Sequence, residues 1–183
     1  MANKSFLKKD KAQVWIETAI YTLIGLAVIA LLLSIITPQI EKTKDKGVVA
    51  QTITALNILH NKILEVEQSP GRVGIVELKI GKGKLEIDSR EDLIKYVLEN
   101  TRLEVSQPGQ EIKEGNVILK TKKTGSRYEI TLTMLYNNSL NITYQEGEKL
   151  KTLTASQSLY RLQMENVGDN PPGQKLHIDF DVL

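Results

Sequence analysis

The stretch that decides the fold is VWIETAIYTLIGLAVIALLLSII, residues 14–36, in which Glu17 is the one charged side chain. As an α-helix these 23 residues would be about 35 Å long, against about 30 Å of hydrocarbon in a typical bilayer. The segment is therefore long enough to cross a membrane. Glu17 needs an explanation, because an ionised carboxylate at the centre of a membrane helix costs about 2.5 to 3.5 kcal/mol.

The residues before this segment are basic. Lysines outnumber acids among the first twelve residues by three, and the rest of the chain therefore carries −1 of the total charge of +2. An excess of lysine before a membrane helix predicts a cytoplasmic N-terminus and an external C-terminus. The nearly neutral remainder gives no basic surface of the kind that nucleic-acid partners require. The chain has no cysteine, which excludes disulfides, thiol catalysis and thiolate metal sites.

A second helical pattern follows the apolar segment, over residues 39–68. Apolar residues recur there at intervals of three and four, which predicts an amphipathic helix whose apolar stripe packs on the rest of the chain. The stripe consists of Val49, Ile53, Leu56, Leu59 (or His60), Ile63 and Val66. Pro38 should kink the helix rather than end it, whereas Ser69–Gly71 should stop it. We therefore expect one long helix over residues 13–68.

Residues 69–183 are typical of β-structure, with turn signals every eight to twelve residues. Four hairpins are expected, with turns at residues 81–83, 124–126, 145–148 and 167–173. The spacing of Ser89 and Asp92 resembles a capping box and predicts one helical turn between them. The expected fold class is α+β: a long N-terminal helix followed by an all-β, sandwich-like head.

No pattern in the sequence predicts a catalytic, cofactor or metal site. His60 and His177 have no second ligand nearby in the sequence, so structural roles are expected for both. Residues 81–84, GKGK, lack the spacing of a phosphate loop and are better explained as a hairpin turn. Asp179 and Asp181 point to the same side of a strand. These two carboxylates could bind Ca²⁺, although a solvated strand face is the simpler interpretation.

Asn137 and Asn141 each begin an N-glycosylation acceptor pattern, NNS and NIT. The alternative for the first is a turn formed by Asn137 and Asn138. Asn141 should face outward if its neighbours Leu140 and Ile142 face the core.

The segment Ala12-Gln13-Val14-Trp15-Ile16-Glu17, between a basic leader and an apolar helix, resembles the class III signal peptide of archaeal type IV pilins. The resemblance covers the first forty residues. It implies that a prepilin peptidase removes residues 1–12 by cutting between Ala12 and Gln13, which makes Glu17 the fifth residue of the mature chain. The family more often has glycine before the cut and serine at the third mature position, where this chain has Ala12 and Trp15. The β-rich remainder also looks like the heads of archaeal pilin-like proteins.

The resemblance implies a structural role and no enzymatic activity. The chain would sit in the cell membrane as a single-pass protein and then join an extracellular type IV pilus-like filament with other pilin subunits. Its partners would include an assembly ATPase and a membrane platform. The new α-amine of Gln13 would pair with Glu17 of a neighbouring or the same subunit. Adhesion, motility and DNA uptake are all compatible with such a filament.

Two other interpretations share the apolar helix. One is a single-pass, membrane-anchored surface protein whose β-sandwich ectodomain binds a ligand and does not polymerise. The other is an archaellin of a rotating filament. In the first of these, Glu17 merely reaches back to the cytoplasmic interface beside Lys11.

Overall fold

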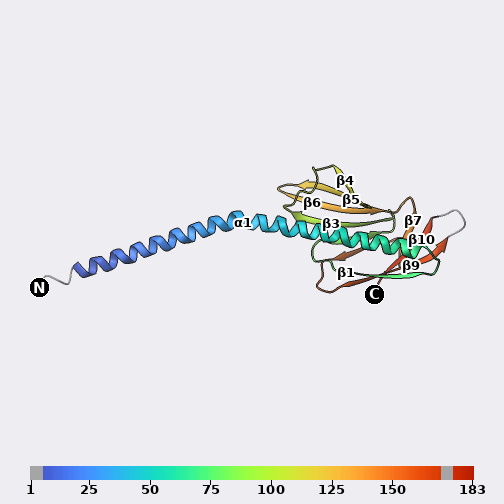
Figure 1. Ribbon diagram of the computed structural model, residues 1–183, viewed down its shortest axis with the longest axis horizontal. Helices are drawn as coiled ribbons and strands as arrows, with labels where there is room; N and C mark the ends of the chain where they lie inside the picture. Colours follow the sequence, from blue (N-terminus) through green and yellow to red (C-terminus); the bar gives the residue numbers. More distant parts are fainter. Residues whose placement is uncertain (1–5, 170–174) are drawn as a thin grey trace. The chain divides into compact units, whose positions relative to one another are not determined.

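The computed structural model of the chain describes residues 6–169 and 175–183, with one helix and ten strands among them (Figure 1). The helix, α1 (Phe6–Glu67), continues through Pro38. The chain divides into two compact units between Glu41 and Lys42. The expected fold class, a long N-terminal helix followed by a β-rich head, is confirmed.

The observed helix begins earlier than expected and ends close to the expected position. The predicted start was residue 13, but α1 begins at Phe6, so most of the predicted leader is helical. Near Pro38, which cannot donate a backbone hydrogen bond, side-chain hydroxyls bond to backbone carbonyls. Thr37 Oγ1 donates to the Leu33 carbonyl at 2.7 Å, and Ser34 Oγ donates to the Leu31 carbonyl at 2.7 Å.

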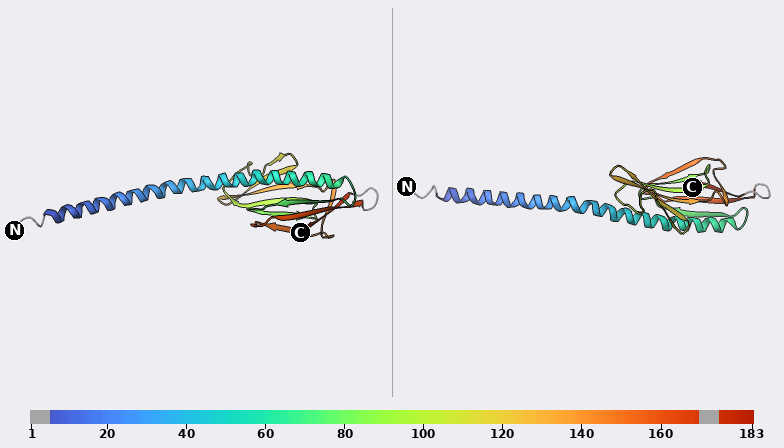
Figure 2. Two further views of the ribbon diagram at one scale, coloured as in Figure 1. Left: turned by 60° about the horizontal axis from the view of Figure 1, so that its bottom comes forward. Right: turned by 90° about the horizontal axis from the view of Figure 1, so that it is seen from above.

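The second unit contains two sheets. One has the strand order β1-β9-β10-β7 and the other has the order β4-β5-β6-β3-β2-β8. The strands are β1 (Val73–Leu78), β2 (Lys84–Asp88), β3 (Leu93–Thr101), β4 (Glu111–Glu114), β5 (Val117–Thr124), β6 (Arg127–Leu135), β7 (Leu140–Tyr144), β8 (Leu150–Thr154), β9 (Tyr160–Asp169) and β10 (Leu176–Val182). The part of α1 that belongs to this unit lies along the sheets in every view (Figure 2).

The predicted apolar stripe of α1 is confirmed. All six of its residues are buried, and they share one hydrophobic cluster with the inner faces of both sheets. In the 4-stranded sheet Leu162, Ile178 and Phe180 are fully buried. The stripe therefore seals a core that neither sheet could close alone.

Two of the four predicted hairpins are confirmed and two are wrong. β5 pairs with β6, and β9 pairs with β10, both antiparallel. The turn at residues 81–83 joins no hairpin, because β1 pairs with β9 while β2 pairs with β3 and β8 in the other sheet. The turn at residues 145–148 also joins different sheets, since β7 runs parallel to β10. These two connections cross from one layer to the other, which the local turn signals do not reveal.

The expected helical turn at Ser89–Asp92 is wrong. The segment is a turn between β2 and β3 in which Asp92 has a positive φ of 49°. The Asp92 carboxylate accepts hydrogen bonds from the Ile142 backbone N–H at 2.8 Å and from Lys175 Nζ at 3.0 Å. These bonds hold the turn against β7 and the start of β10, and such a tertiary contact outweighs a capping-box spacing.

The C-terminus of α1 is held by a residue one hundred positions later. Asn166 is fully buried in β9, and its side-chain Nδ2 donates to the carbonyls of Val66 at 3.0 Å and Glu67 at 3.1 Å. Its Oδ1 accepts from the Gly168 backbone N–H at 2.9 Å. Carbonyls at a helix end lack the usual intrahelical partner, and Asn166 supplies hydrogen bonds to two of them. The Val66 carbonyl also accepts a longer bond from the Ser69 backbone N–H at 3.5 Å.

Candidate functional site: the apolar segment of the long helix

The apolar segment of α1 is exposed along its whole length. Every residue from Val14 to Thr37 is exposed, including Trp15 at 76% and Leu23 at 70%. The helix contains an 18-residue window of mean hydropathy 2.7, none of which is buried. By length and composition this helix could cross a membrane. A continuous apolar surface of this size marks a membrane or protein interaction site.

Glu17 lies within this exposed surface. Among the side chains that the structure describes, none forms a hydrogen bond or ion pair with it. The nearby hydroxyls bond to the helix backbone instead, with Thr18 Oγ1 donating to the Val14 carbonyl at 2.9 Å and Thr22 Oγ1 donating to the Ala19 carbonyl at 2.9 Å. The side chains of Ala12 and Gln13, the predicted cleavage site, lie outside the described part of the chain.

The two glycosylation candidates have different surroundings. Asn137 is exposed in the turn between β6 and β7, as the alternative turn interpretation also expects. Asn141 is half-buried on β7, and Thr143, the third residue of its pattern, is buried. A glycosylated asparagine must be accessible, so the structure favours Asn137 of the two. Modification of either residue stays a prediction.

Both histidines are held by hydroxyl groups. His60 Nδ1 lies 3.0 Å from the Tyr136 hydroxyl, and the two rings are tilted, with centroids 5.8 Å apart. Burial lowers the pKa of His60 and raises the pKa of Tyr136. His177 Nε2 lies 2.7 Å from Thr143 Oγ1, whose hydroxyl donates to Asp179. Among the described residues no three His, Cys, Asp or Glu side chains converge as metal ligands.

The two carboxylates on β10, Asp179 and Asp181, form hydrogen bonds with β7 and with the loop that follows it. Ile178 and Phe180 are buried, so Asp179 and Asp181 share the opposite face, as expected. The Asp179 carboxylate also accepts from the Glu146 backbone N–H at 2.9 Å. The Asp181 carboxylate accepts from the Gln145 side-chain amide at 2.9 Å. Both carboxylates therefore hold the loop after β7 against β10.

Two open clefts lie along α1. The cleft of about 530 Å³ beside His60, which we call the His60 cleft, is also lined by Glu67, Lys113 and Tyr136. Burial raises the pKa of Glu67. The second cleft, of about 630 Å³, is lined by Lys46, Asn57 and Glu104 among others. Ionisable groups with perturbed pKa values in a cleft are one signature of a binding site.

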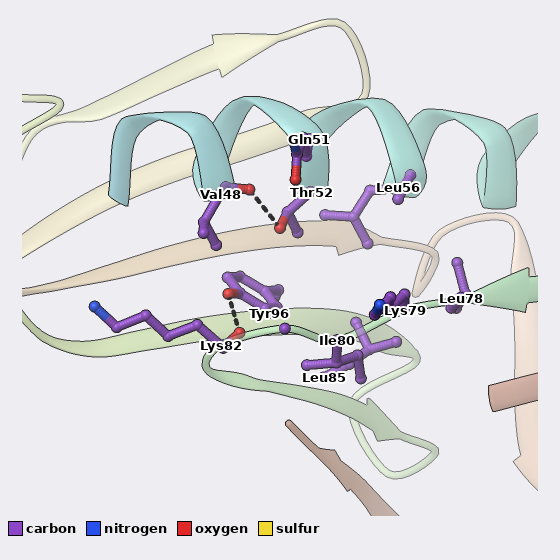
Figure 3. Close-up of a pocket in the computed structure, with 12 residues that line it drawn as sticks. Val48, Gln51, Thr52, Leu56, Leu78, Lys79, Ile80, Lys82, Leu85 and Tyr96 are labelled. Atoms are coloured by element: carbon purple, nitrogen blue, oxygen red, sulfur yellow. Dashed lines mark hydrogen bonds between the residues drawn. The ribbon is translucent and has the colours of Figure 1, made fainter. Parts of the chain in front are cut away.

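A smaller cavity of about 100 Å³ lies between α1 and the connection from β1 to β2 (Figure 3). Thr52 and Leu56 reach it from the helix, Ile80 lines it from the connection, and Tyr96 lines it from β3. The Tyr96 hydroxyl donates to the Lys82 carbonyl, and burial raises its pKa to about 12. The lining is mainly apolar, so this cavity is a gap in the packing under the helix.

Sequence reasoning missed the role of Asp45. Its side chain is only 4% exposed, and it accepts hydrogen bonds from Lys82 Nζ at 2.5 Å and from the buried Thr101 hydroxyl. Asp45 lies one helical turn before Val49, so it occupies the next position of the buried stripe. The spacing of four residues from Val49 was a signal that Asp45 faces the core. Charged residues are mostly exposed, however, so the sequence alone suggests that Asp45 faces solvent.

Comparison with protein-family models, with curated proteins and with solved structures gives no match for this chain.

Proposed function

We propose that this chain is a structural subunit of an extracellular type IV pilus-like filament. In this proposal the helix first holds the subunit in the membrane, and the leader is then removed between Ala12 and Gln13. The apolar helices afterwards pack together in the filament core, while residues 42–183 form the outward head. The observation that carries the proposal is the fully exposed apolar surface over residues 14–36, interrupted by Glu17.

Glu17 favours a filament over a plain anchor. A charge inside a bundle of apolar helices must find a partner, because an unpaired buried charge costs several kcal/mol. Removal of the leader would create a positive α-amine at Gln13, one helical turn from Glu17 and available to a neighbouring subunit. Such a pair would also set the axial register between subunits, as a single polar residue does in a coiled coil.

The head supports the proposal in a more general way. Residues 42–183 form a compact unit with its own hydrophobic core, so the head does not depend on the apolar segment for burial. The apolar segment is thereby left free for a membrane and then for other helices.

The test is a Glu17→Gln substitution in cells that naturally produce the chain. This change keeps the size of the side chain and removes its charge, so membrane insertion and leader cleavage should continue while filament yield falls. A Glu148→Gln variant, altered at an exposed position of the head, is the matched control. Sheared surface fractions would be weighed and imaged by electron microscopy, and the N-terminal residue would be read by mass spectrometry.

Equal filament yield from Glu17→Gln and wild-type cells would contradict the charge-pairing role. Mature protein that starts at Met1 or Ala2 would contradict the processing step. If no filament contains the wild-type chain, the pilin proposal is wrong.

The second candidate function is a membrane-anchored surface protein that binds a ligand without polymerising. The His60 cleft favours it, since its volume lies in the range of about 300 to 1,000 Å³ that ligand pockets occupy, and it contains three groups with perturbed pKa values. For this function the head should reach the surface normally in the Glu17→Gln variant, and no filament should contain the chain.

A further inference from the structure

Three lysines of α1 follow its apolar segment and point to different sides of the helix. Lys42, Lys44 and Lys46 are all exposed. Successive residues of an α-helix are rotated by about 100°, so Lys42 and Lys46 lie on one face and Lys44 lies on the opposite face. We call these three residues the lysine ring. No hydrogen bond or ion pair is formed by them with any side chain that the structure describes.

The acid within the ring does not neutralise it. The Asp45 side chain is 4% exposed, and its carboxylate is bound by Lys82 Nζ at 2.5 Å and by the Thr101 hydroxyl. Thr101 is fully buried, so this contact draws the carboxylate into the protein. Asp45 is thereby paired with a lysine far along the chain, and the three ring lysines keep their charges directed outward.

The position of the ring in α1 suits a membrane surface. Lys42 follows Ile36, the last residue of the apolar segment, by six residues of helix, which correspond to about 9 Å. Each headgroup layer of a bilayer is about 5 to 8 Å thick. Long lysine side chains bend back toward this layer while their stems stay on apolar surface. The ammonium groups of the ring can therefore reach lipid phosphates.

We propose that Lys42, Lys44 and Lys46 bind the phosphate groups of anionic lipids where α1 leaves the bilayer. This inference rests on the membrane-inserted stage of the proposed function. A bilayer surrounds a helix that crosses it, which matches lysines directed to opposite sides, whereas a docked protein or nucleic acid would contact one side. Each lysine near an anionic surface contributes about a fivefold preference, so three together give a preference on the order of 100-fold.

The experiment uses the full chain reconstituted into vesicles. The chain has no cysteine, so an Ala50→Cys substitution at an exposed position one turn beyond Lys46 gives a single site for a fluorophore. Quenching by spin-labelled phosphatidylglycerol is compared with quenching by spin-labelled phosphatidylcholine. The test variant replaces the three ring lysines by glutamine. The control variant replaces Lys122, Lys123 and Lys149, three exposed lysines of the head, in the same way.

The labelled chain and the control should prefer phosphatidylglycerol, and the ring variant should lose most of that preference. The preference should also weaken as salt is raised, because exposed charges are screened. Equal preference in the ring variant and the control would overturn the proposal. Complete loss of the preference on adding soluble glycerol phosphate at constant ionic strength would assign the ring to free phosphate instead of lipid. If the wild-type chain does not float with vesicles, the membrane-inserted stage of the proposed function is wrong. If it floats but shows no lipid preference, only the lysine-ring proposal is wrong.

Discussion

Replacing Asn166 by alanine should destabilise the head strongly, because its buried side chain ties the end of α1 to β9 by hydrogen bonds. The change removes two hydrogen bonds to the carbonyls of Val66 and Glu67 and one from the Gly168 N–H. Each buried polar group left without a partner costs about 1 to 3 kcal/mol. Water can reach some of these groups once the side chain is gone, so we expect a total loss of about 3 kcal/mol.

The assay is thermal and urea unfolding of residues 42–183, the compact unit that contains this contact. A loss of about 3 kcal/mol should lower Tm by about 10 °C for a unit of this size. Asn138→Ala, which alters an exposed turn residue, is the matched control and should change stability by less than about 0.5 kcal/mol. Equal stabilities of the Asn166→Ala and Asn138→Ala variants would refute the capping role.

An Asn166→Asp variant separates hydrogen bonding from packing. It keeps the shape of the side chain but directs a carboxylate at two carbonyl oxygens. Burial and these oxygens favour the protonated acid, so its pKa should lie above the ordinary value of about 3.9. A carboxyl group with a raised pKa stabilises the fold below the unfolded-state pKa and loses that contribution as pH rises. The loss in free energy of unfolding of Asn166→Asp relative to wild type should therefore be smaller at about pH 3 than at about pH 7. If this loss in free energy of unfolding does not change with pH, the Asn166 side chain stabilises the head mainly by its shape and not by its hydrogen bonds.

Two further changes test the packing of α1 on the sheets. Gly74→Ala should lower the free energy of unfolding by about 1 to 3 kcal/mol, because the new Cβ would lie 2.7 Å from Val66 Cγ2. Gly81→Ala is the control: its Cβ meets nothing within 4 Å, so urea unfolding should show a nearly unchanged stability. Burial lowers the pKa of His60, so the native state disfavours its protonation, and stability should fall as pH drops from about 7 to about 5. His60→Gln should remove that part of the pH dependence, and an unchanged slope would show that His60 does not cause it.

The long helix, the apolar stripe and the two confirmed hairpins follow from local patterns. Periodicity alone identified Val49, Ile53 and the other stripe residues, because a helix that packs along a sheet must present one apolar face to it. The hairpins β5–β6 and β9–β10 join strands that are neighbours in the sequence, so their turn signals matched their pairing. The exposed apolar segment and Glu17 were likewise visible in the sequence, since both depend on composition.

The division of strands between two sheets was not predictable from the same patterns. The connections after β1 and β7 carry hairpin-like turn residues, yet each crosses to the other layer. Which strands pair depends on which apolar faces close the core together with α1, and this choice involves contacts far apart in the sequence. β4 was missed for a related reason: all four of its residues are exposed, so it has no apolar alternation.

The tertiary structure alone decided the roles of the buried polar residues. In the sequence Asp45 is one charge in a charged segment, and Asn166 is one polar residue on a strand that is otherwise ordinary. The fold brings Lys82 and Thr101 to Asp45. It also brings the end of α1 to Asn166. Local sequence therefore determined where the helix and most strands form, because periodicity and turn chemistry act between near neighbours. A buried polar group must instead find its hydrogen-bond partner across the core, and only the folded chain specifies that partner.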